Sequence, residues 1–195
     1  MAKAGAPPKF KEAHINWVFW KIANKQPMGR KMLVAETGLG EGSLRTILER
    51  LEEYDLVRSA RSGRALTENG KKVLERLREM ICIERLGRLD MSDKMNNCVV
   101  MIKGAAGNVK EGMEQRDEAI KVGRSGATTL IVKEGKLLMP GFDETLTIDE
   151  RYPKDARKIE KVLHPEDGNV VVIGSENSPQ MAEEAAWVAA STLLA

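Results

Sequence analysis

The most regular pattern of apolar and polar positions in this 195-residue chain lies within its first third. Leu44, Ile47, Leu48 and Leu51 follow the i, i+3, i+4, i+7 spacing that aligns side chains along one side of an α-helix. The other side of the same segment carries a mixture of hydrogen-bond donors and acceptors: Ser43, Arg45, Thr46, Glu49 and Arg50. We therefore predict an amphipathic helix over residues 41–53 whose polar side contacts a partner.

A second, shorter helical pattern over residues 31–37 comes directly before this helix. Between the two, Gly38-Leu39-Gly40 supplies a tight turn, because glycine adopts positive φ at little steric cost. Two helices joined by a glycine-containing turn, the second with one polar face, are the parts of a helix-turn-helix.

A short hairpin is predicted directly after the amphipathic helix. Residues 56–58 are strand-like, residues 61–64 form a turn, and residues 65–66 return. The charged side chains between Asp55 and Glu68 are three arginines: Arg58, Arg61 and Arg64. The hairpin is therefore purely cationic, as expected for the wing of a winged helix.

These residues carry a resemblance to a known group of proteins. The run from Gly38 to Leu56 and the ending Leu66-Thr67-x-x-Gly70 resemble the winged-helix domains of bacterial and archaeal transcription regulators. They are similar, among others, to the DNA-binding domain of the central glycolytic genes regulator. The whole chain resembles an uncharacterised archaeal family that joins such a domain to a carboxy-terminal domain of unknown function. Residues 115–121 and 126–129 carry this second resemblance. The resemblance implies an architecture and, for the first domain, DNA binding.

Further helices are predicted on both sides of this region. Residues 9–25 carry two apolar stripes, so this first helix packs against more than one neighbour. Another helix begins at Glu68 and continues to about Leu86, with a broad apolar surface. It either forms a dimer interface or only joins two domains. Because isolated monomers seldom expose large apolar patches, we expect a homodimer.

The second half of the chain alternates between strands and helices after a polar segment at residues 87–97. The expected strands are residues 98–103, 128–133, 136–139 and 170–173, and the expected helices are 110–122, 154–163 and a last one capped by Asn177 or Ser178. This order predicts a two-layer α+β domain with helices on one face of the sheet. The chain is thus predicted to be multi-domain, with an all-α winged helix-turn-helix domain at 1–90 and an α+β domain at 91–195.

The charge of the chain is distributed unevenly, although its net value is only +2. Residues 1–90 contain 18 Lys/Arg against 12 Asp/Glu, whereas residues 91–195 contain 13 against 17. A basic half joined to an acidic half indicates a polyanionic partner for the first half only. Together with the helix-turn-helix pattern, this favours double-stranded DNA as the partner.

On that interpretation the polar side of helix 41–53 enters the major groove. Arg45 could donate to guanine O6 and N7 or to a phosphate, and Ser43 and Thr46 could serve bases or backbone. The hairpin arginines would contact neighbouring phosphates or the minor groove. The alternative is a winged helix that makes protein contacts, with its arginines simply solvated.

The second half contains one group of residues suited to a small anionic metabolite. Loop amides together with a cationic side chain commonly hold phosphate or carboxylate. The candidates are Arg116, Asp117, Lys121, Gly126 and Thr128. The alternative is that the glycines only shape turns and that the charged side chains are solvated.

Neither a metal nor a cofactor is expected. His14 and His164 lie in different predicted domains, and Cys82 and Cys98 lack the spacing of zinc ligands. Phosphate-loop, dinucleotide-binding and hydrolase motifs are missing from the sequence. We expect no enzyme activity, although Asp117 or Lys121 could act as an acid or a base in the second domain.

The sequence also bears on the cell compartment and on the growth temperature of the source. No apolar run reaches the length of a membrane span and no signal peptide is recognisable, so we expect a cytoplasmic protein. Glutamine occurs at only three positions beside abundant Lys, Arg and Glu, which hints at a thermophile.

These observations favour a transcription regulator whose second domain senses a metabolite or mediates assembly. Two alternatives stay open: a bifunctional metabolic enzyme with an auxiliary winged-helix domain, and a nucleic-acid-binding adaptor without a ligand. A deep glycine-lined pocket would favour the sensor or the enzyme, and a filled domain centre the adaptor.

Overall fold

The computed structural model describes residues 10–141 and 145–194. The chain divides into two compact units, residues 1–75 and 76–195, and each is described by itself. The division falls within helix α4 (Glu68–Met80), earlier in the chain than the boundary expected after residue 90. Among the helices of the described residues, none is long and apolar enough to cross a membrane.

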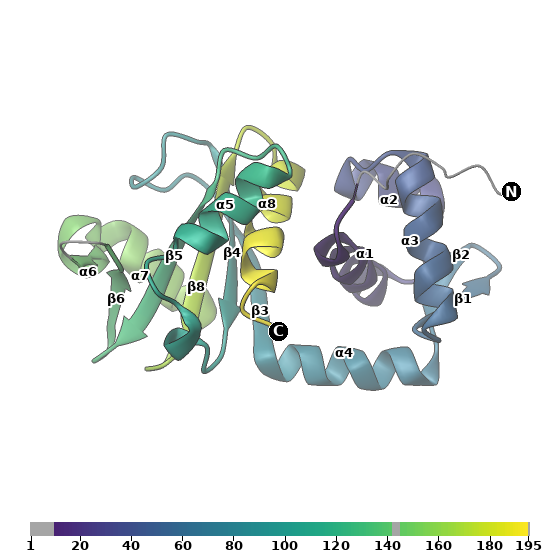
Figure 1. Ribbon diagram of the computed structural model, residues 1–195, viewed down its shortest axis with the longest axis horizontal. Coiled ribbons are helices and arrows are strands. Elements are labelled where there is room, and N and C mark those ends of the chain that lie inside the picture. The colour runs from purple at the N-terminus through teal and green to yellow at the C-terminus, as the bar shows by residue number, and fades with distance from the viewer. Residues whose placement is uncertain (1–9, 142–144, 195) are drawn as a thin grey trace, which may run out of the picture. The chain divides into compact units, whose positions relative to one another are not determined.

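The first unit contains three helices followed by a two-stranded antiparallel hairpin (Figure 1). Its elements are α1 (Glu12–Lys25), α2 (Arg30–Thr37), α3 (Glu41–Glu53), β1 (Val57–Ala60) and β2 (Gly63–Leu66). This order of helices and strands agrees with the prediction from the sequence. The predicted apolar side of α3 is confirmed, because its members are at most 3% exposed: Leu44, Ile47, Leu48 and Leu51. Burying each of these side chains stabilises the unit by roughly 1.5–3 kcal/mol.

The turn between α2 and α3 depends on one glycine. Gly38 has φ of 71° and its N–H donates to the Val34 carbonyl at 2.8 Å, which ends α2 in the left-handed conformation. Gly40, with φ of −64°, has an ordinary backbone conformation. The buried Thr37 hydroxyl adds a hydrogen bond from the Leu39 N–H at 3.2 Å. The start of α3 is therefore held firmly by the end of α2.

The hairpin is fixed to the segment between α1 and α2. Met28 exchanges two backbone hydrogen bonds with Arg64, at 2.9 and 2.8 Å, and the Gln26 side chain accepts from the Leu66 N–H at 2.8 Å. A Cβ on Gly63 would lie 2.3 Å from the Met28 carbonyl carbon, so this close approach requires glycine. The turn is consequently shorter than predicted, because Gly63 and Arg64 belong to β2 rather than to the turn.

The second unit is built on a six-stranded sheet in the order β3-β4-β8-β5-β6-β7, and every neighbouring pair is antiparallel. Its strands are β3 (Ile81–Leu86), β4 (Asn96–Ile102), β5 (Ala127–Lys133), β6 (Lys136–Met139), β7 (Leu146–Thr147) and β8 (Val170–Glu176). The predicted helix from Glu68 to about Leu86 is wrong in its second part. It ends at Met80, because Ile81–Leu86 pairs along its whole length with β4.

Helices cover both faces of this sheet, and Figure 1 shows them on opposite sides. These elements are α5 (Met113–Lys121), α6 (Ile148–Arg151), α7 (Pro153–Leu163), α8 (Pro179–Ser191) and the short 3-10 turn η1 (Ala106–Asn108). α5 and α8 pack together on one face, whereas Ile159 and Leu163 of α7 join Val99 and Met101 of β4 in the core on the other. The unit therefore has three layers and not the predicted two. The reason is that β4 and β8 are buried almost throughout, so both of their faces need a cover.

Candidate functional site

The exposed side of α3 carries Arg45 and Glu49 one turn apart. The Arg45 side chain is 67% exposed, and its Nε lies 3.8 Å from the Glu49 carboxylate one turn further on. An exposed pair of this kind contributes at most about 1 kcal/mol, so either side chain can exchange its partner for another. Arg45 and Glu49 are thus available as a donor and an acceptor next to each other.

The other predicted contact residues of α3 are less accessible. Ser43 and Thr46 are half-buried, and the Thr46 hydroxyl donates to the Gly42 carbonyl at 3.3 Å. The Arg50 guanidinium carbon lies 5.4 Å from the centre of the Phe10 ring, so this side chain packs toward the segment before α1. Of the five residues predicted on this face, only Arg45 and Glu49 are exposed.

The hairpin carries two exposed arginines and one that is already engaged. Arg58 and Arg61 are exposed, and within the described residues neither forms an ion pair. Arg64 is half-buried, with its Nε 2.8 Å from a carboxylate oxygen of Glu52 on α3. Its N–H is not well directed at that oxygen, so the contact is a charge pair rather than an aligned hydrogen bond. Arg64 therefore links α3 to β2, which differs from its expected place in a flexible turn.

The charge of α3 itself is acidic, a point that the amphipathic pattern alone does not reveal. Its residues include Glu41, Glu49, Glu52 and Glu53 against Arg45 and Arg50. Two of these glutamates, Glu49 and Glu52, lie beside arginines of the same unit. The hairpin therefore carries arginines without acidic residues, while α3 offers a mixed donor and acceptor surface.

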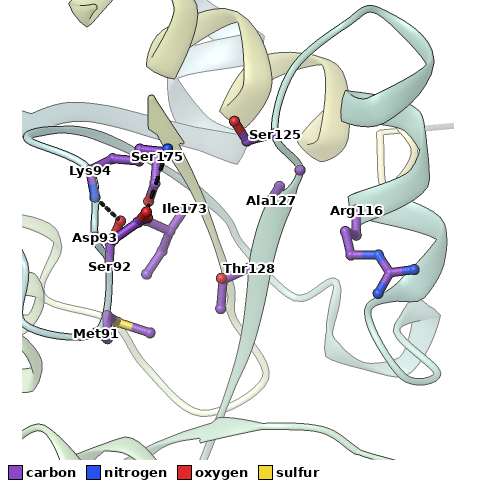
Figure 2. A pocket seen from close by; sticks show the side chains of 11 residues that line it. Met91, Ser92, Asp93, Lys94, Arg116, Ser125, Ala127, Thr128, Ile173 and Ser175 are labelled. Carbon is purple, nitrogen blue, oxygen red and sulfur yellow. Dashed lines mark hydrogen bonds and ion pairs between the residues drawn. The ribbon is translucent and has the colours of Figure 1, made fainter. Parts of the chain in front are cut away.

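The second unit contains a separate hollow of about 290 Å³, drawn in Figure 2. It is formed by a segment before β4, the start of β5, part of α5 and the end of β8, and hydroxyl groups dominate its polar lining: Ser92, Ser125, Thr128 and Ser175. The buried Glu176 carboxylate accepts the Ser125 N–H at 2.5 Å, which fixes the loop before β5. The Ser175 hydroxyl donates to the Asn97 side chain at 2.6 Å. The hollow therefore has a polar wall held by the protein's own hydrogen bonds.

The cations around this hollow are each beside a carboxylate. Lys94 Nζ lies 3.5 Å from Asp93, and Arg116 Nη2 lies 3.2 Å from Asp117. Figure 2 shows the guanidinium of Arg116 directed away from Ser125 and Thr128, so that mainly its aliphatic part faces the hollow. The charge available to an entering ligand is therefore small.

The five residues predicted to hold a ligand are only partly brought together. Arg116, Gly126 and Thr128 line the hollow, whereas Asp117 and Lys121 are not among its lining residues. The Lys121 ammonium lies 2.5 Å from Glu118, and this hydrogen bond raises the pKa of Lys121 above its ordinary value. Residues 91–94, from the polar segment at residues 87–97, form one wall of the hollow.

Metal-ligating and nucleophilic residues are scattered in the part of the chain that the structure describes. There, no three His, Cys, Asp or Glu side chains come together to hold a metal ion. Cys82 and Cys98 lie on the neighbouring strands β3 and β4 and are not joined by a disulfide. Burial, assisted by the charge of Glu84, raises the pKa of the half-buried Cys82 thiol and so lowers its reactivity.

Comparison with known proteins places both units in one family. A family model described as "PH0730-like, N-terminal domain" matches residues 18–72, and one described as "Domain of unknown function (DUF4443)" matches residues 94–193. No curated protein matches the chain. Among solved structures, "Hypothetical protein PH0730 from Pyrococcus horikoshii OT3" is 31% identical, with a TM-score of 0.72 over 93% of this chain and 92% of that one. These matches confirm the predicted resemblance to an archaeal two-domain family. The chain therefore belongs to the PH0730-like family, in which this amino-terminal domain is joined to a DUF4443 domain.

Proposed function

We propose that this protein is a DNA-binding transcription regulator and that its first unit is a winged helix. The observation that carries the proposal is the exposed Arg45 on α3 together with Arg58 and Arg61 on the adjoining hairpin, which contains no acidic residue. The order of three helices and a hairpin, with the glycine-capped turn between α2 and α3, supports the same interpretation.

In the proposed complex α3 lies in the major groove and the hairpin lies on the backbone. Arg45 can donate to guanine O6 and N7, and Glu49 can accept from cytosine N4, so the two side chains suit a G·C-containing site. Arg58 and Arg61 contact phosphates. Because α3 has more glutamates than arginines, it repels phosphates, and general attraction to DNA comes mainly from the hairpin.

A salt titration tests this function. The full chain is expected to bind a labelled duplex of about 30 base pairs in fluorescence anisotropy, with log K falling linearly against log salt with a slope of about −2 or steeper. Such a slope corresponds to at least about two neutralised phosphates. Failure to bind at about 50 mM salt, or binding that does not change with salt, would overturn the proposal.

A second candidate function is the binding of a small, polar and uncharged molecule in the hollow of the second unit. The observation that favours it is the hydroxyl lining combined with cations that are already beside carboxylates. The earlier expectation of an anionic ligand included Asp117 and Lys121, which do not line this space. The lining residues include no histidine, and their one carboxylate lies beside Lys94, so the geometry supports binding more than catalysis.

A thermal-shift screen with sugars, polyols and amino acids tests this second function. A ligand at 100 times its Kd stabilises the folded protein by about 2.7 kcal/mol, which corresponds to a rise in Tm of about 5–10 °C. We expect Thr128→Tyr, which fills the hollow, to abolish this rise, and Ser62→Tyr in the hairpin turn to keep it. A shift that survives in Thr128→Tyr would mean that the ligand binds elsewhere.

A further inference from the structure

Helix α7 carries an unusual row of cations along its exposed side. Lys154, Arg157, Lys158 and Lys161 are all exposed and follow the i, i+3, i+4, i+7 spacing. The opposite side of α7 is buried against the sheet through Ala156, Ile159 and Leu163. The row therefore extends for about 10 Å on a helix whose position is set by the core.

A fifth cation, Arg88, joins this row from the segment after β3. Together these residues surround a hollow of about 410 Å³, and all seven of its lining residues are charged: Arg88, Asp90, Lys154, Asp155, Arg157, Lys158 and Lys161. Lys158 Nζ donates to the Arg88 carbonyl at 2.9 Å, and the buried Asp155 carboxylate accepts the Met91 N–H at 2.8 Å. The segment is thus tied to α7 at two points. We call these five cations the α7 basic stripe.

The positive charge of the α7 basic stripe is not balanced by neighbours in the described residues. There, none of its five members forms an ion pair with a carboxylate. Asp155 is turned inward to the backbone of Met91, and Glu160 on the flank of α7 faces Asp149. Burial and the charge of Asp149 raise the pKa of Glu160, whereas the charge of Arg157 lowers it. Five cations against two carboxylates leave a strong local attraction for anions.

The residue types that line the hollow beside α7 favour a polyanion over a small molecule as its ligand. Pockets for small molecules are lined mostly by apolar and aromatic side chains, with a few polar groups for orientation. The hollow beside α7 is lined by charged residues alone, without an aromatic or aliphatic residue among them, so its apolar surface comes from the stems of lysine and arginine side chains. A row of ammonium and guanidinium groups about 10 Å long suits successive phosphates of an extended strand.

We propose that the α7 basic stripe binds the phosphate backbone of nucleic acid. This second contact surface lies in the unit whose overall charge is acidic, and it does not depend on α3 or the hairpin. It makes phosphate contacts only and adds affinity without sequence preference, because contacts to phosphate oxygens carry no sequence information.

The test uses the full chain and a 30-base-pair duplex of mixed sequence, titrated at several salt concentrations. The stripe variant Lys154→Gln/Arg157→Gln/Lys161→Gln is expected to bind at least about tenfold more weakly at low salt, with a salt slope reduced by about two to three units. The matched control Lys103→Gln/Lys110→Gln/Lys133→Gln removes three exposed cations elsewhere in the same unit and should leave the slope almost unchanged. Circular dichroism checks folding, which the stripe substitutions should preserve because their side chains are exposed.

A third protein, Arg45→Ala/Arg61→Ala, separates this proposal from the function of the first unit. If that variant binds like the original and the stripe variant does not, the proposed role of α3 and the hairpin fails while the stripe proposal stands. If the stripe variant and the matched control have the same slope, the stripe is ordinary solvated charge and the proposal is overturned.

Calorimetry with inorganic tripolyphosphate tests whether the stripe binds a small anion instead of nucleic acid. Loss of tripolyphosphate binding with unchanged DNA binding would identify a small-anion site and would also overturn the proposal.

Discussion

Replacement of Gly174 by alanine is expected to destabilise the second unit by about 3 kcal/mol or more, which lowers its Tm by about 10 °C. Gly174 lies in the central strand β8, where α8 crosses the sheet. A Cβ at this position would lie 2.2 Å from the Ala182 carbonyl oxygen and 2.5 Å from the Ala186 nitrogen. Both atoms belong to the helix backbone, so neither can move aside as the end of a side chain would. The strand and the helix would have to separate.

Gly107 offers a matched control for this substitution. A Cβ built on Gly107 would meet no atom within 4 Å beyond its own stretch of chain, so Gly107→Ala should change the Tm by no more than about 2 °C. Scanning calorimetry gives the Tm, and amide hydrogen exchange localises the loss of protection to β4, β8 and α8. Unchanged protection of β8 in Gly174→Ala would mean that the packing of α8 on the sheet is looser than its geometry indicates.

The difference between α3 and α4 explains how far the fold could be predicted from the sequence. In α3 the apolar positions repeat with helical period and are bounded by polar residues, so the pattern is local and complete. After Met80 the apolar residues Ile81 and Ile83 continue the helical pattern of α4 for several positions. They belong to a strand because they pair with β4, which lies later in the chain and whose register no local pattern reveals.

This reassignment also changes the basis of the expected homodimer. Ile81 and Ile83 contributed to the apolar surface of the helix predicted from Glu68 to about Leu86, but both residues lie in strand β3 of the sheet. On α4 itself, Val73, Leu77 and Met80 recur with helical spacing, and Met80 is 46% exposed. The homodimer stays a prediction, and it now rests on this narrower row.

The candidate sites depend on contacts between residues far apart in the sequence. Arg64 is engaged by Glu52, twelve positions earlier, because the hairpin folds back beside α3. The α7 basic stripe is completed by Arg88 and the hollow near Thr128 by Ser92, both from the polar segment at residues 87–97, whose composition indicates no site. Residue types and helical faces could be predicted locally, whereas these combinations follow from the order of strands in the sheet.

The engaged Arg64 shifts the expected phosphate contact of the hairpin to Arg61, which is exposed at the turn. Arg61→Ala should weaken binding to all duplexes by a similar factor and flatten the salt slope by about one unit. Arg45→Ala should instead cost roughly 1–3 kcal/mol on a preferred duplex, about 5- to 150-fold, and relax the choice of one base pair. The two substitutions thus distinguish a phosphate contact, made by Arg61, from a base contact, made by Arg45.

Parallel anisotropy titrations with a selected duplex and its scrambled version measure both effects. Lys25→Ala is the control, because Lys25 Nζ is already 2.6 Å from Glu36 and should contribute little to phosphate binding. Arg64→Ala provides a second comparison: it should lower the Tm of the first unit, since it removes the ion pair with Glu52 and leaves that carboxylate only the Ser59 hydroxyl, whereas Arg61→Ala should not. If Arg45→Ala weakens selected and scrambled duplexes by the same factor, Arg45 contacts only phosphate. The reading role of α3 would then lose its main support, because Arg45 and Glu49 are the two predicted contact residues that α3 exposes.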